Sequence, residues 1–68
     1  MSDFDRHHRK CRSNGGTSDR ENISIVRVEL HKAWHRLFAN ATPEEIAKII
    51  SDVWIDPSFE MIAVRRNV

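Results

Sequence analysis

The first part of the chain has the alternating pattern of two short strands. Residues 4–10 alternate so that Asp5 and His7 lie on the same side of an extended segment. Residues 22–28 are rich in β-branched side chains, which is typical of a strand. The segment between them, residues 11–21, is polar and contains two adjacent glycines, so it is expected to be a loop. The pattern predicts an antiparallel pair of strands.

The pattern then changes to a helical period. Residues 29–39 contain good helix formers, and two neighbouring stripes run along them. One stripe comprises Leu30, Ala33, Trp34 and Leu37, and the adjoining stripe comprises His31, His35 and Phe38. We expect the first stripe, including the indole of Trp34, to face the core, with the two histidines at its border.

A second helix is predicted to start after Thr42. Residues 42–45, Thr-Pro-Glu-Glu, have the form of a capping box with proline at the first helical position. Apolar residues then recur at helical spacing, and this face would pack on the first helix or on a partner: Ile46, Ile49, Ile50, Val53 and Trp54. The helix is expected to end before Pro57. Residues 59–64 would form either a third strand at the sheet edge or a docked extended tail.

These elements predict an α+β fold in a single domain over residues 1–68. A ββα core would occupy residues 4–39, and the second helix and tail, residues 42–68, would pack on it. A domain of 68 residues buries only about 60% of its unfolded surface. Such a small domain usually needs additional stabilisation by disulfides, a metal or a partner. The single Cys excludes an internal disulfide and fits a reducing compartment, which leaves a metal or an oligomer.

Membrane insertion and secretion are not expected. No apolar run approaches the roughly 20 residues of a membrane span. The first residues also lack the apolar core of a signal peptide. The expected location is the cytoplasm of a prokaryote or of a phage-infected host.

The charge of the chain is small but unevenly distributed. The net charge is +1, yet residues 1–36 hold 8 Lys and Arg against 5 Asp and Glu, while residues 37–68 hold 3 against 5. The cations expected to contact nucleic acid are Arg6, Arg9, Lys10 and Arg12, and Arg20 is a further cation around the same site. They would attract a phosphate backbone by counterion release, although a solvated basic loop explains the same pattern.

The four histidines have spacings that a metal centre can use. His7 and His8 are adjacent, so on a strand they point to opposite faces. His31 and His35 are four residues apart, so on a helix they share a face and can share an ion. Three imidazoles would leave positions of a divalent cation open to water or substrate, and the remaining histidine would be a candidate base. Asp5 would orient a ligand or a neighbouring arginine, unless it is simply exposed.

This ordered set resembles the HNH, or ββα-metal, nucleases, and most closely the HNH module of the nuclease colicins. The resemblance covers about the first half of the chain and rests on His7, His8, Ser13, Gly15, Gly16, Asn22, His31 and His35. It implies that His7, His31 and His35 bind the metal and that His8 is the general base. It also implies that Asn22 ties the long loop down and so holds His8 in place.

The activity implied by the resemblance is metal-dependent hydrolysis of phosphodiester bonds in nucleic acid, which we expect to be DNA. One divalent cation, either Zn²⁺, Ni²⁺, Mg²⁺ or Mn²⁺, would be needed, and the products would carry a 5′ phosphate and a 3′ hydroxyl. Imidazole ligands suit Zn²⁺ and Ni²⁺ better than Mg²⁺, which prefers oxygen. The second helix would serve a homodimer or a larger protein partner.

Two positions depart from the family pattern. Cys11 stands where the family often has proline, and Arg27 stands where a Thr or Ser that caps the helix is expected. Cys11 also raises an alternative, in which it completes a closed zinc site and the chain is a non-catalytic module that binds nucleic acid or a protein. A third possibility is an accessory protein whose second helix binds a larger nuclease.

Overall fold

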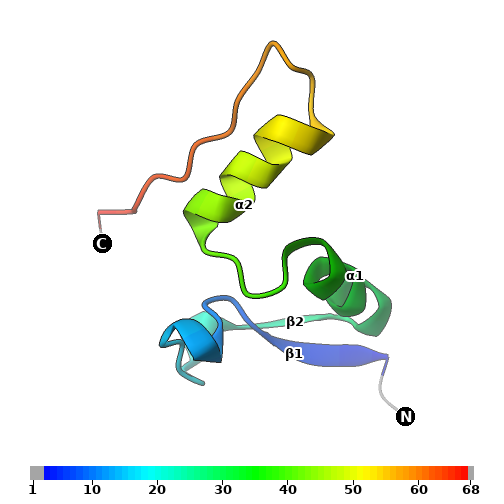
Figure 1. The fold of residues 1–68 in the computed structure, drawn as a ribbon. Coiled ribbons are helices and arrows are strands. Elements are labelled where there is room, and N and C mark those ends of the chain that lie inside the picture. Colours follow the sequence, from blue (N-terminus) through cyan, green and yellow to red (C-terminus); the bar gives the residue numbers. More distant parts are fainter. Residues whose placement is uncertain (1–2, 68) are drawn as a thin grey trace.

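The computed structural model describes residues 3–67 and has a small mixed α/β fold of two antiparallel strands and two helices, a ββα arrangement followed by a second helix (Figure 1). The predicted domain includes residues 1, 2 and 68, which lie outside the described residues. The elements are β1 (Phe4–His8), β2 (Ile23–Arg27), α1 (Val28–Phe38) and α2 (Pro43–Ile49). No helix among the described residues is long and apolar enough to cross a membrane.

Both strands are present and pair as predicted, but they are shorter than expected. The first strand ends at His8 instead of residue 10, and the second begins at Ile23 and ends at Arg27 instead of covering residues 22–28. Asn22 belongs instead to a short 3-10 turn, η2 (Arg20–Asn22). The backbone ladder does not extend to Lys10, because the N–H of Lys10 donates to the side chain of Asn22 and not to a backbone carbonyl.

The strand register determines which side chains face α1. The aligned pairs are Phe4 with Arg27, Asp5 with Val26, Arg6 with Ile25, His7 with Ser24 and His8 with Ile23. Because side chains alternate across a strand, His7, Ser24 and Val26 share one face of the sheet. Helix α1 packs on this face, where the rings of His7 and Trp34 are 6.0 Å apart. The opposite face is open, and Ile25 on it is 64% exposed.

The core is smaller than the sequence pattern suggested. Among the described residues, only Phe38 is a buried hydrophobic side chain, and its ring lies 4.5 Å from that of Trp34. The expectation that Leu30 and Leu37 face the core was wrong, since they are 61% and 46% exposed. A sheet of two strands is narrow, so it covers only part of the apolar stripe of α1.

Helix α1 begins without a side-chain cap, as expected from a sequence that has Arg27 at the position of a capping Thr or Ser. Arg27 is the N-cap residue, and it makes no side-chain cap hydrogen bond. The backbone N–H of Val28 instead donates to the carbonyl of Asp3 at 3.0 Å. Arg27 pairs with Glu29 at 2.9 Å and lies 5.6 Å from the centre of the Phe4 ring. The helix start is therefore supported by the chain entering β1.

The capping box of α2 is confirmed. The hydroxyl of Thr42 accepts the N–H of Glu45 at 3.3 Å, and the Glu45 carboxylate accepts the N–H of Thr42 at 2.9 Å. The hydrogen bond from the Thr42 backbone N–H stabilises the ionised carboxylate and is the largest cause of the lowered pKa of Glu45. The sharp turn before this helix passes through Ala39, whose φ is 49°.

Beyond Ile49 the helix continues as a π-helical turn, η3 (Ile50–Trp54), which the sequence did not predict. Residues 59–64 then run back alongside α2 as an extended tail (Figure 1). The third strand is therefore excluded within residues 3–67, where the sheet has two strands, and the docked tail is the correct alternative. Its anchor is Ser51, whose hydroxyl accepts the N–H of Met61 at 2.7 Å.

Candidate metal centre

Three histidines from β1 and α1 converge on one point. Each of His7, His31 and His35 offers one ring nitrogen, and these three nitrogens all lie within 4.8 Å of one another. The ring centres of His7 and His31 are 5.1 Å apart, and those of His31 and His35 are 4.7 Å apart. His7 and His31 are partly buried, whereas His35 is exposed. The cluster is therefore accessible from the side of His35.

The local fold explains why these side chains meet. His7 lies on the face of the sheet that α1 covers, because it pairs with Ser24 in the register. Helix α1 follows β2 without a connecting loop, which brings its first turns across the strand that carries His7. The spacing of His31 and His35 places both on the same side of the helix.

The hydrogen bonds of the cluster indicate which nitrogens carry protons. His31 Nδ1 lies 3.1 Å from Asp5 Oδ2, and a carboxylate accepts, so the proton is on Nδ1. His31 Nε2 then has a free lone pair when the ring is neutral. His35 Nε2 lies 3.0 Å from this atom and donates to it. Asp5 thus holds the ring of His31 in the tautomer that a metal ligand needs.

The environment of His7 keeps its ring neutral. Partial burial lowers the pKa of His7 below its usual value of 6.5, because a charged ring loses hydration there, and the positive charges of His31, His35 and His8 lower it further. A neutral imidazole is the form that binds metal ions. The environment of His7 therefore suits a metal ligand.

The arrangement also fits a divalent cation geometrically. With Zn–N bonds of about 2.0–2.1 Å, the nitrogens of a tetrahedral site lie about 3.3 Å apart. The His31 and His35 nitrogens are already 3.0 Å apart, and His7 has to close from at most 4.8 Å. Cys11 is not part of the cluster among the described residues, so it does not close the site. Three protein ligands would leave at least one coordination position open.

His8 lies on the other face of β1 and outside this cluster. Its Nε2 is 3.2 Å from the hydroxyl of Ser18, a residue of the loop between the strands. If Nε2 donates to this hydroxyl, Nδ1 keeps the lone pair that a general base uses. Sequence reasoning missed Ser18, because a serine in a polar loop carries no signal of its own.

Asn22 connects the two ends of the loop that contains Ser18. Its Oδ1 accepts the N–H of Lys10 at 2.7 Å, and its Nδ2 donates to the carbonyls of Lys10 at 3.1 Å and Thr17 at 2.6 Å. The backbone carbonyl of Asn22 also accepts the N–H of Arg9 at 2.7 Å. The side chain of Asn22 therefore binds three backbone groups, two of Lys10 and one of Thr17.

The two glycines of the loop have separate reasons to be glycine. Gly15 has a φ of 91° and ends the 3-10 turn η1 (Arg12–Asn14) in the left-handed region. A Cβ atom at Gly16 would collide with the carbonyl oxygen of Lys10. This is the same carbonyl that Asn22 contacts, so the loop is closely packed where it is anchored.

The basic residues predicted to contact nucleic acid lie in different places. Arg9 lines a hollow beside the histidines, and its guanidinium donates to the carbonyl of Glu21 at 3.1 Å. Arg9 and Lys10 together line a second hollow near the tail. Arg6 lies on the open face of the sheet, while Arg12 and Arg20 lie exposed in the 3-10 turns.

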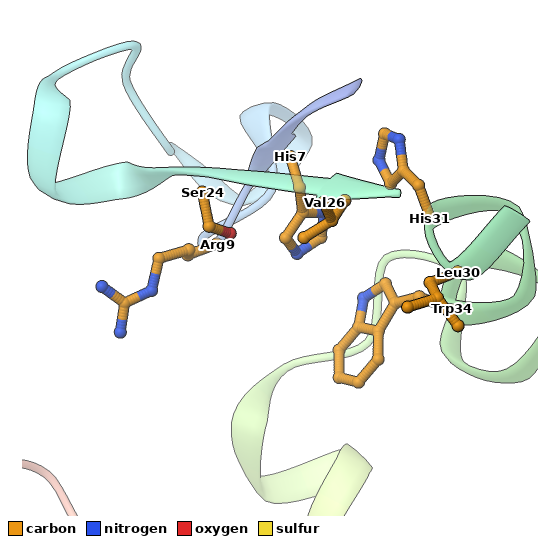
Figure 2. Close-up of a pocket in the computed structure, with 7 residues that line it drawn as sticks. All are labelled: His7, Arg9, Ser24, Val26, Leu30, His31 and Trp34. Carbon is orange, nitrogen blue, oxygen red and sulfur yellow. The ribbon is translucent and has the colours of Figure 1, made fainter. Parts of the chain in front are cut away.

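The hollow beside the histidines has a volume of about 450 Å³ and apolar walls. Figure 2 shows that His7 and Ser24 reach it from the strands and that Trp34 reaches it from α1. Leu30 and Val26 complete its apolar side. The exposed Leu30 is therefore part of the rim of this hollow and not of a core.

No protein-family model, curated protein or solved structure matches this chain. The interpretation of the site therefore depends on its geometry and chemistry.

We expect the purified chain to bind one Zn²⁺ or Co²⁺ through the three clustered histidines. His35→Ala should abolish binding, because it removes a ligand, and Asp5→Asn should weaken binding by about 10- to 100-fold, because the tautomer of His31 is no longer fixed. Cys11→Ser is the matched control and should bind like the parent. Competition with a chelating dye measures the affinities, and loss of binding in Cys11→Ser would contradict this assignment.

The loop anchor can be tested with an isosteric change. Asn22→Asp keeps the acceptor of Asn22 but removes both donated bonds and places a charge against two carbonyls, so it should destabilise the fold by about 1–3 kcal/mol. Asn14→Asp makes the same change where Asn14 donates one bond to the carbonyl of Asn40, and it should cost less. Urea unfolding compares the two, and an equal or smaller loss in Asn22→Asp would argue against the anchor.

The lowered pKa of His7 predicts that the metal-free chain loses stability in mild acid. Below pH 6.5 the unfolded chain takes up a proton at His7 that the folded chain resists, so stability is fully present above this pH and falls below it. Urea unfolding at pH 7.5 and pH 5.5, with a chelator present, should show this decrease. His7→Gln should reduce the difference between the two pH values, and an unchanged difference would contradict the prediction.

Proposed function

We propose that this chain is a metal-dependent endonuclease of the HNH type that hydrolyses phosphodiester bonds in DNA. The observation that supports this most is the convergence of His7, His31 and His35, with His8 as the next residue along the same strand. The bonds of Asn22 across the loop agree with the anchoring role that the resemblance implies. The ββα order of the elements is also consistent with this class.

In this proposal the clustered histidines and the loop have separate tasks. A divalent cation held by His7, His31 and His35 would neutralise the charge that develops on the phosphate and on the leaving 3′ oxygen. His8 accepts the proton of the attacking water while the water oxygen bonds to phosphorus. The bond from phosphorus to the 3′ oxygen then breaks, and this oxygen takes a proton from solvent water, which leaves a 5′ phosphate and a 3′ hydroxyl.

Ser18 and Asn22 position the base in this mechanism. Ser18 holds the ring of His8 through Nε2, so that the other nitrogen can face the water. Asn22 holds the loop that carries Ser18 by binding the carbonyl of Thr17. Arg9, beside the metal-binding histidines, supplies a positive charge for the incoming phosphate.

The open side of the cluster favours catalysis over a closed structural site. His35 is exposed and Cys11 lies outside the group, so a fourth protein ligand of the kind considered from the sequence does not occlude the cation. The alternative function is a non-catalytic binding module that the same metal stabilises, and a measurement of nuclease activity distinguishes the two functions.

Nicking of supercoiled plasmid DNA tests the proposal. The parent chain, loaded in turn with Zn²⁺, Ni²⁺, Mn²⁺ and Mg²⁺, should convert plasmid to open circles with at least one of these ions. His8→Ala should lower the rate by about 10²- to 10⁴-fold, because the general base is lost. The 5′ ends of the product should carry phosphate, which end labelling detects.

The control for this experiment is metal binding by His8→Ala itself. The variant should bind the cation as tightly as the parent and keep the parent's circular dichroism spectrum, so that the loss of rate reports on catalysis. A folded, metal-loaded parent that cuts no faster than His8→Ala would show that the chain is a binding module.

A further inference from the structure

A second hollow of about 450 Å³ lies between the loop, the start of α2 and the C-terminal tail. Arg9 and Lys10 line it from the loop, and Arg65 and Arg66 line it from the tail. Glu44 is the acid in its lining. Four cations thus gather around one depression from segments that are more than 50 positions apart in the chain.

The position of the tail is set by specific hydrogen bonds. Ser51 accepts the N–H of Met61 at 2.7 Å, and its hydroxyl lies 2.8 Å from the carbonyl of Ala47 and 3.3 Å from that of Met61. This contact holds the tail along α2, and the tail then runs toward the loop (Figure 1). Arg65 and Arg66 follow a few residues later, where they meet the cations of the loop.

The two hollows have one lining residue in common, Arg9. Arg9 lines both the hollow beside the clustered histidines and the basic hollow. A chain of phosphates bound at the histidines can therefore pass Arg9 and continue between Lys10 and the tail arginines. A phosphodiester backbone matches this path, because it carries one negative charge per nucleotide and the lining has an excess of positive charge.

We propose that the basic hollow binds the backbone of the DNA strand that flanks the scissile phosphate, with Arg65 and Arg66 as phosphate contacts. This inference rests on the proposed nuclease function, and it assigns a role to the tail that the ββα unit alone does not need. The contacts are independent of sequence, since they involve phosphates and not base edges.

The salt dependence of DNA binding tests the inference. A duplex of 20 base pairs is bound to the full Zn²⁺-loaded chain in a His8→Ala background, which slows cutting by about 10²- to 10⁴-fold. Fluorescence anisotropy then gives the affinity between 50 and 200 mM salt. Arg65→Gln with Arg66→Gln should make the negative slope of log affinity against log salt shallower by about 1.8, since each phosphate contact contributes about −0.9. Between 50 and 200 mM salt, the affinity of the arginine variant would then fall by a factor about twelve times smaller than the affinity of the parent does.

The matched control removes the same charge elsewhere. Lys32→Gln with Lys48→Gln changes two exposed lysines that are not in the lining of the basic hollow, and it should change the slope by less than half as much. An unchanged slope in the arginine variant, or an equal change in the lysine variant, would overturn the proposal.

The plasmid assay keeps this outcome separate from the nuclease proposal. If the parent nicks DNA and the arginine variant keeps the slope of the parent, the proposed role of the basic hollow is wrong, whereas the nuclease proposal is unaffected. If the parent does not nick DNA, the nuclease proposal fails, and with it the placement of a scissile phosphate at the histidines.

Discussion

The antiparallel register of β1 and β2 is the constraint on which the rest of the molecule depends. It pairs His7 with Ser24, and this places the His7 ring under α1, where His31 and His35 lie. A shift of the register by one residue would turn His7 to the open face and bring His8 under the helix, because side chains alternate across a strand. The clamp of Asn22 on the backbone of Lys10 lies just beyond the last pair and opposes such a shift.

Much of the fold was predictable because short-range patterns determine it. The strands, the helices and the capping box at Thr42 all follow from alternation, period and cap chemistry. The burial pattern was not predictable, since Leu30 and Leu37 have helical spacing but the two strands are too few to cover them. The path of the tail depends on Ser51, and a single serine in a helical segment gives no sign that it will bind a strand-like segment ten residues away.

The candidate site divides in the same way. The convergence of His7, His31 and His35 could be predicted, since it needs only a strand facing a helix and a spacing of four residues. The support of His8 by Ser18 could not, because it depends on the course of a loop whose length allows many conformations. The position of Cys11 could not be predicted either, because its spacing in the sequence would also allow Cys11 to be a fourth ligand. The structure places Cys11 outside the cluster.

The hydrogen bond between His35 and His31 has a consequence for which ions the cluster accepts. The shared proton occupies the space between the two nitrogens that an incoming ion would need. Loading therefore requires the proton of His35 to move from Nε2 to Nδ1, a change of tautomer that keeps the ring neutral, and strong bonds from the ion to nitrogen favour this change. Late first-row ions meet this condition better than Mg²⁺ does. The selectivity of the centre would thus be set by the strength of the bonds from the ion to the ring nitrogens and not by the width of the cavity.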